Sequence, residues 1–223
     1  MSDITCPYYD TELFSKLILY PIQINNDIYI NLKSNLKAKV EKKCNKYGYI
    51  TKVYKILDMS EGEIIPENFD ASVIFNVKFS CRICLPTINK KIICKVELYN
   101  KSLIKAINGP IICIISNNNI NTDNFSIDNK GDYIHTSNAP IKTGSHIIVK
   151  INGLNFYGGD ERILLLGQLD DLPTNDEIED FYNEDLDDND KIQDNNLELN
   201  ESEEEVSSDL DSEEAQNENY ENL

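Results

Sequence analysis

Residues 103–115 read LIKAINGPIICII, which is two short apolar runs joined by Asn108 and Gly109. Both runs are rich in isoleucine, a β-branched residue that favours strands. An Asn-Gly pair between two such runs is a strong short-range signal for a tight hairpin. Pro110 has no backbone N–H to donate, which suits the first position of a strand. This stretch therefore predicts a β-hairpin.

Similar β-rich runs flank the hairpin on both sides. They cover residues 91–99 before it and residues 145–153 and 161–169 after it, with turn residues between them. A longer polar insertion, residues 117–143, separates the third run from the fourth, and a loop at 154–160 joins the last two. Five short strands with this spacing predict an all-β, five-stranded closed barrel of the OB type over residues 86–172.

The chain before the barrel mixes strand and helix signals. A run at 13–24, interrupted by Pro21, is typical of a strand with an edge or a bend. Apolar residues then recur every fourth position, as on an amphipathic helix, at Ile28, Leu32, Leu36, Val40 and Cys44. Runs at 47–56, 60–68 and 71–85 predict three further strands. Residues 12–85 are therefore predicted to form an α+β domain.

The net formal charge of −18 comes from the C-terminal part of the chain. Residues 170–223 hold 23 acidic residues and one lysine, whereas residues 1–169 hold 16 acidic and 20 basic residues. A segment this acidic buries too little apolar surface to offset the entropy of ordering it. Residues 173–223 are therefore predicted to be an acidic tail, disordered from about Asp176 onward. Two roles stay open for it: solvating the protein, or competing for the body's basic surface or a basic partner.

Several classes of protein are disfavoured by what the sequence lacks. No apolar run approaches the roughly 18 residues of a membrane span, and the first residues do not read as a signal peptide, so an intracellular protein is expected. The common phosphate-loop, dinucleotide, nucleophile-elbow and zincin motifs are absent. His135 and His146 are the two histidines of the chain. No catalytic residue, cofactor or metal is predicted.

Two of the six cysteines have the spacing of a zinc site. Cys81 and Cys84 have the two-residue gap of a zinc knuckle, but the sequence around them reads as a strand. Residues three apart on a strand point to opposite faces and cannot hold one ion, and no second pair follows. Small buried cysteines are the favoured interpretation.

Five stretches of the chain carry a resemblance to a known family. They are 44–53 (CNKYGYITKV), 62–66 (GEIIP), 71–79 (ASVIFNVKF), 108–116 (NGPIICIIS) and 145–153 (SHIIVKING). In order and spacing, from about residue 13 to 172, they resemble the larger stalk subunit of multisubunit DNA-directed RNA polymerases. This is the seventh subunit of RNA polymerase II, which has archaeal and large-DNA-virus counterparts.

The resemblance implies a noncatalytic subunit that acts in transcription. Its first domain would dock on the large polymerase core subunits, a smaller stalk partner would pack along both domains, and its S1-type barrel would face the nascent RNA. The implied location is with the transcription machinery, in the nucleus or, for a virus, in the virion or host cytoplasm. The docking residues assigned on this basis are Tyr47, Gly48, Tyr49, Gly62 and Pro66.

A barrel that faces RNA needs cations for phosphate and aromatic rings for stacking. The candidates are Lys90, Lys91, Lys95, Lys101, Lys105 and Lys150, with Tyr99 as a stacking platform. The other interpretation of these lysines is that they only solvate the barrel. Two other functions stay open: a free-standing S1-type RNA-binding protein, such as a translation or RNA decay factor, and a structural or chaperone-like protein that uses its acidic tail.

Overall fold

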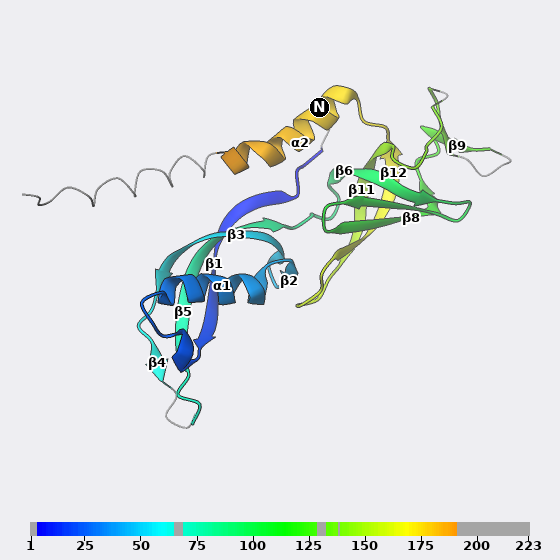
Figure 1. The fold of residues 1–223 in the computed structure, drawn as a ribbon. Helices are drawn as coiled ribbons and strands as arrows, with labels where there is room; N and C mark the ends of the chain where they lie inside the picture. Colours follow the sequence, from blue (N-terminus) through cyan, green and yellow to red (C-terminus); the bar gives the residue numbers. More distant parts are fainter. Residues whose placement is uncertain (1–3, 65–68, 129–132, 138, 191–223) are drawn as a thin grey trace, which may run out of the picture. The chain divides into compact units, whose positions relative to one another are not determined.

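The computed structural model describes residues 4–64, 69–128, 133–137 and 139–190. The described chain is mostly β-strand with two α-helices, and neither helix is long and apolar enough to cross a membrane (Figure 1). The first half forms an antiparallel sheet with the strand order β1-β5-β3-β2, and a fifth, short strand, β4, pairs with the end of β5. These strands are β1 (Tyr8–Leu19), β2 (Lys43–Asn45), β3 (Gly48–Met59), β4 (Glu63–Ile64) and β5 (Val73–Cys84).

One face of this sheet is covered by the helix α1 (Ile28–Val40). Leu32 and Leu36 of α1 are fully buried against sheet residues such as Val53 and Phe79. The two leucines are four residues apart, which places both on the same side of the helix. This spacing is the periodic pattern that predicts the helix from the sequence.

The boundaries around α1 differ from the expected ones. The predicted helical repeat extended to Cys44, but α1 ends at Val40 and Cys44 lies in β2, buried against the barrel. Glu41 is already extended and its carboxylate accepts the backbone N–H of Val53 at 2.7 Å, which draws the chain into the sheet. The strand expected to continue through Pro21 also ends earlier, at Leu19, and the short 3-10 helix η1 (Pro21–Gln23) follows it.

The second half contains the predicted five-stranded barrel, which is confirmed as closed. Its strands are β6 (Lys91–Tyr99), β7 (Leu103–Asn108), β8 (Ile111–Ile120), β11 (His146–Asn155) and β12 (Ile163–Asp171). Around the barrel they run in the order β6-β7-β8-β12-β11, and β12 lies parallel to β8 whereas the other neighbours are antiparallel. Every second residue points inward, and the interior is filled largely by isoleucine, valine and leucine.

The hairpin at residues 103–115 forms, with its turn one residue later than expected. Asn108 pairs with Ile111, so Gly109 and Pro110 make the two-residue turn. Gly109 has a φ of +53°, which glycine adopts at little cost, and Pro110 needs no backbone donor there. Asn108 is buried; its side chain donates to Ile93 O at 2.7 Å and accepts from the Tyr8 hydroxyl at 3.0 Å.

Part of the insertion between β8 and β11 packs against the barrel core. It contains the hairpin β9 (Phe125–Ile127) and β10 (Tyr133–His135). Phe125 and Tyr133 are buried in the barrel core, and the Tyr133 hydroxyl donates to Asn100 O at 2.9 Å. The insertion, expected to be polar loop, therefore extends the core.

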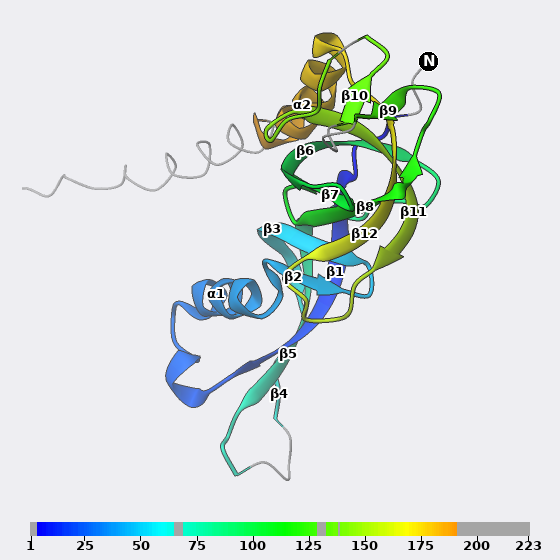
Figure 2. The same ribbon diagram turned by 90° about the vertical axis from the view of Figure 1, so that its right-hand side faces the viewer.

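The beginning of the predicted acidic tail is helical, which corrects the expected start of disorder at Asp176. Instead of disorder from Asp176, the chain forms the helix α2 (Asn175–Asp190), which is labelled in Figures 1 and 2. A capping box starts it: Glu177 N–H donates to Thr174 Oγ1, and the Glu177 carboxylate accepts the Thr174 N–H. Phe181 is only 5% exposed and packs on Ile93 and Ile148 of the barrel. The rest of the tail, 191–223, lies outside the described residues.

Candidate nucleic-acid interface

Three of the predicted RNA-binding lysines lie together on the outside of β6 and β11. The register pairs Lys95 with His146, Ile93 with Ile148, and Lys91 with Lys150 across these two antiparallel strands. Ile92, Cys94, Ile147 and Val149 alternate with them and point into the barrel. We call the six outward residues the β6–β11 face: two isoleucines between two pairs of basic side chains.

The charges of this face are partly compensated. Lys91 Nζ lies 2.6 Å from an Asp170 carboxylate oxygen on β12, in an ion pair that is about one third exposed on the lysine side. Lys95 and Lys150 have no ion-pair partner within the described part of the chain. The pKa of His146 is lowered, first by burial and then by the charge of Lys95. The face therefore favours an anion and carries its open positive charge on Lys95 and Lys150.

The helix α2 lies over the middle of the β6–β11 face. Ile178, Phe181 and Tyr182 pack with Ile93 and Ile148, and the N-terminal residue Ile4 joins the same cluster. The Tyr182 ring meets the His146 ring edge-on, with centroids 6.0 Å apart. The two isoleucines are thus removed from solvent by an acidic helix.

The remaining RNA-binding candidates are scattered. Lys105 on β7 is held by Glu97 at 2.7 Å, and Tyr99 packs partly against the barrel core, which reduces the ring area open to stacking. Lys101 is exposed in the β6–β7 turn. Lys90 precedes β6, and its carbonyl accepts the Ile151 N–H at 2.9 Å. These four residues lie outside the paired stretch of β6 and β11 that carries the β6–β11 face.

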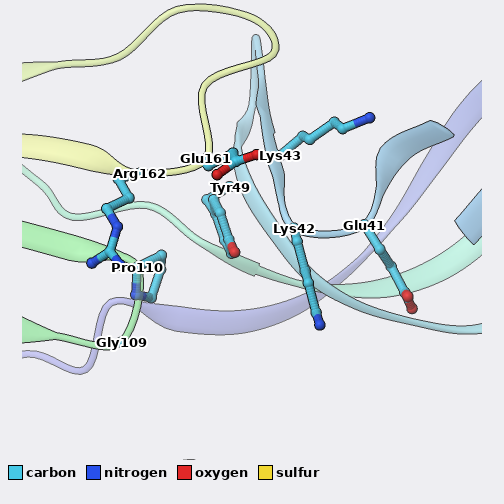
Figure 3. A pocket seen from close by; sticks show the side chains of 8 residues that line it. All are labelled: Glu41, Lys42, Lys43, Tyr49, Gly109, Pro110, Glu161 and Arg162. Carbon is cyan, nitrogen blue, oxygen red and sulfur yellow. The ribbon is translucent and has the colours of Figure 1, made fainter. Parts of the chain in front are cut away.

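A second basic site, which the sequence did not suggest, lies where the first sheet meets the barrel. A cavity of about 380 Å³ is lined by Glu41, Lys42, Lys43, Tyr49, Gly109, Pro110, Glu161 and Arg162 (Figure 3). Backbone hydrogen bonds hold its sides together: Cys44 N–H donates to Asp160 O at 2.7 Å, and Gly159 N–H donates to Cys44 O at 2.9 Å. The Glu41 carboxylate already accepts the backbone N–H of Val53. The cations Lys42, Lys43 and Arg162 therefore face one further carboxylate in the lining, that of Glu161.

Arg162 is the signal that could have pointed to this cavity. The chain has 19 lysines but two arginines, and the other arginine, Arg82, is buried beside Asp10 in the first sheet. A guanidinium binds phosphate or carboxylate with a rigid fork that lysine cannot reproduce. An exposed arginine in a chain that otherwise uses lysine is therefore worth examining.

The predicted docking residues fall into two places. Gly48 and Tyr49 lie at the contact between sheet and barrel: Gly48 has a φ of +126°, a Cβ there would stand 2.7 Å from Cys84 O, and Tyr49 packs against the barrel core. Tyr47 is exposed beside them. Gly62 lies against Val73 and Phe75 near β4, and Pro66 lies outside the described residues.

The end of the first sheet around β4 is apolar and open to solvent. Ile64 of β4 pairs with Val73, at the end of β5 opposite to the one that leads into the barrel. Ile64, Phe69 and Ile22 are 65%, 102% and 87% exposed, respectively. Exposed apolar side chains of this size gathered at one end of a sheet are typical of a protein contact.

The cysteines and histidines form no obvious reactive centre. Cys81 packs in the core of the first sheet and Cys84 in the barrel core, so their thiols lie on opposite faces of β5. Burial raises the pKa of Cys81 to about 12, which disfavours the thiolate that zinc binds. His135 bridges Ser137 and Asp171 by contacts of 2.7 and 2.9 Å.

The comparison with known proteins gives a relative but no family model that matches. The chain is 36% identical over 180 residues to a protein of Acanthamoeba polyphaga mimivirus named as a DNA-directed RNA polymerase subunit. The match covers 80% of this chain and 90% of the mimivirus protein.

Proposed function

This chain belongs to the family of DNA-directed RNA polymerase subunits, and from that membership we propose that it is the noncatalytic stalk subunit. In this role it docks on the large core subunits, pairs with a smaller stalk subunit where one is present, and contacts the nascent RNA. It works inside the cell, with the transcription machinery of a virus related to mimivirus.

The observation that carries the stalk assignment is the order of the barrel strands. Numbered along the barrel, they run 1-2-3-5-4 with strands 3 and 5 parallel, which is the arrangement expected of an OB or S1-type barrel. An α+β module with one helix precedes it, and β2 is bonded to the barrel loop at Asp160. This combination supports two joined domains, 12–85 for docking and 86–172 for RNA.

The open apolar end of the first sheet supports the docking part of the proposal. Ile64, Phe69 and Ile22 present large side chains that a core subunit would cover, and Gly62 and Pro66 belong to the same loop region. The docking set of the proposal therefore centres on this end, with Tyr47, Gly48 and Tyr49 near the barrel as a second contact. Burying such side chains stabilises a complex by about 1.5–3 kcal/mol each.

Affinity purification of the tagged full chain from cells that make the polymerase tests the assignment. We expect the large polymerase subunits to co-purify in stoichiometric amounts, and Ile64→Asp combined with Phe69→Asp to reduce that recovery at least about tenfold, because two charges would be buried in the contact. Tyr157→Asp is the matched control, since Tyr157 is 70% exposed in a barrel loop.

The same purification separates the proposal from the alternative of a free-standing RNA-binding protein. In that case RNA would be recovered with the wild-type chain and large polymerase subunits would be missing, and the stalk assignment would be wrong. A separate assay tests whether the subunit is noncatalytic: the purified chain alone should synthesise no RNA.

The position of RNA on the barrel follows from what the outside of the strands offers. OB barrels commonly bind nucleic acid on strands 2 and 3, here β7 and β8. The outward side chains there are half-buried and mostly aliphatic, at Leu103, Ile107, Ile112 and Ile114, and the cation Lys105 is paired with Glu97. RNA contact is therefore proposed for the lysines of the β6–β11 face, aided by Lys90 and Lys101, with Tyr99 as the nearest aromatic ring.

A further inference from the structure

We propose that α2 is a built-in acidic cover of the β6–β11 face, and that single-stranded RNA and α2 compete for this face. The inference rests on the proposed RNA contact of the barrel and adds its regulation. In the closed form α2 occupies the face, and RNA binds Lys91, Lys95 and Lys150 when α2 leaves.

The first argument is steric. Phe181 is 5% exposed because it covers Ile93 and Ile148, which stand midway between the two pairs of basic side chains. Strand neighbours lie roughly 5 Å apart and alternate outward residues roughly 7 Å apart, so an RNA backbone that reached both pairs would cross the same two isoleucines. RNA and α2 cannot both lie there.

The second argument is electrostatic. The first two turns of α2 carry Asp176, Glu177, Glu179 and Asp180 and no basic residue. These carboxylates bring negative charge close to a face whose lysines Lys95 and Lys150 have no ion-pair partner within the described residues. An acidic helix over a basic face imitates the charge of RNA, and it also repels RNA while it is in place.

The third argument is that few apolar side chains attach α2 to the barrel. Among the described side chains of α2, residues 175–183, the apolar contacts come from Ile178, Phe181 and Tyr182. They pack with Ile4, Ile93, Ile148 and the His146 ring, in a small cluster that is separate from the barrel core. A helix held by so few side chains opens at a lower free-energy cost than the barrel unfolds. Release of α2 therefore does not require the barrel to unfold.

The experiment uses the full chain and a fluorescein-labelled single-stranded oligouridylate of about 20 nucleotides, long enough to span an OB-fold site. Fluorescence anisotropy gives the dissociation constant at several salt concentrations between about 50 and 200 mM. We expect Phe181→Ala to tighten RNA binding about tenfold, which is the order by which loss of one buried phenylalanine shifts an equilibrium. Amide hydrogen exchange over residues 175–183 shows whether α2 is released.

Two further variants keep the test decisive. Phe181→Asp forces a charge against Ile93 and Ile148 and releases α2 if the alanine variant does not. Adding Lys95→Gln and Lys150→Gln to the released chain should cancel the gain and reduce the slope of log affinity against log salt by about 1.4, because each phosphate contact contributes about 0.7. Lys33→Gln with Lys37→Gln on α1 is the matched control and should change neither quantity.

Each result has one meaning. Equal RNA affinity of wild-type and α2-released chains would overturn the cover and leave the RNA contact standing. Absence of RNA binding in both would overturn the cover together with the proposed RNA contact, while polymerase co-purification would still report on the stalk role separately. A gain that survives loss of Lys95 and Lys150 would also overturn the proposal, since RNA would then bind elsewhere.

Discussion

Gly167 of β12 lies where the barrel interior has no room for a side chain. A Cβ atom there would stand 2.3 Å from Val149 Cγ1 and 2.6 Å from Cys113 Sγ, and both neighbours are buried. We expect Gly167→Ala to lower the free energy of unfolding by about 1–3 kcal/mol, the usual cost of overfilling a packed core. Urea unfolding followed by tyrosine fluorescence measures it, since the chain has no tryptophan.

Gly153 of β11 is the matched control for Gly167, in the neighbouring strand. A Cβ there would have its nearest contact at 3.5 Å, with Leu166 Cβ, which is ordinary van der Waals distance. Alanine at 153 should leave stability unchanged or raise it slightly, because it reduces the freedom of the unfolded chain. Equal losses at both positions would contradict this account of the barrel interior.

His146 is expected to make the protein less stable in mild acid. Burial against α2 and the neighbouring charge of Lys95 lower its pKa below the ordinary 6.5, so the folded chain holds the neutral ring. As the pH falls through 6.5, the unfolded chain binds a proton before the folded chain does, and stability is lost until the pH passes below the lowered pKa of the folded state.

His146→Gln tests this linkage because glutamine does not titrate. The difference in urea midpoint between wild-type and variant should change between pH 7.5 and 5.5, with the wild-type chain losing more stability, while carboxylates elsewhere affect both alike. Amide hydrogen exchange over residues 175–183 should become faster in the wild-type chain at pH 5.5, relative to the variant, because protonation of His146 weakens the contact with α2. A pH-independent difference between the two chains would contradict the lowered pKa.

Among the elements, those defined by long apolar patterns were predictable and those decided by side-chain partners were not. The five barrel strands follow from alternating isoleucine and valine separated by turn residues, and α1 follows from Leu32 and Leu36. The end of α1 depends on the Glu41 carboxylate reaching Val53 N–H, and no local pattern specifies that contact. Propensity and periodicity give an element's existence more reliably than its boundary.

The helix α2 shows how net charge can hide a local signal. Thr174 and Glu177 have the spacing of a capping box, and Ile178, Phe181 and Tyr182 follow at the three- and four-residue spacing of one helical face. The acidic composition outweighed these features because it argues against an independent core, but α2 needs no core of its own. It uses Ile93 and Ile148, whose outward position became clear only when β6 and β11 were paired.

The candidate site also contains residues that the sequence predicts and residues that it does not. Lysines 91, 95 and 150 are predicted as cations of a barrel that the resemblance implies faces RNA, and the register places them on one face. The sequence does not reveal the cavity residues Lys42, Lys43 and Arg162, because the two lysines lie at the start of β2 and Arg162 lies just before β12, more than a hundred positions further along the chain. Only the packing of the sheet on the barrel brings them together. Proximity of this kind is a property of tertiary structure and leaves no short motif.

On the scale of the whole molecule, the uneven charge predicts a long-range effect that differs from the contact made by α2. Residues 191–223 carry 12 acidic residues and one lysine, so deleting them changes the formal charge from −18 to −7. We expect the deletion to raise the association rate with labelled RNA by up to about tenfold at low ionic strength, because repulsion of a polyanion is relieved. The gain should vanish near 1 M salt, where the Debye length is about 3 Å.

Stopped-flow anisotropy on the chain ending at Asp190 measures this rate, and a full-length chain with glutamine and asparagine in place of the acids at 201–214 separates charge from length. The gain from Phe181→Ala should multiply with that of the deletion, because one removes a competitor at the β6–β11 face and the other lowers a diffuse repulsion. Polymerase co-purification should be the same with and without residues 191–223, since the proposed docking end is formed by Ile22, Ile64 and Phe69. Loss of polymerase on deletion would instead assign the acidic segment to assembly, and a gain that persists at high salt would assign it a direct contact with the RNA-binding face.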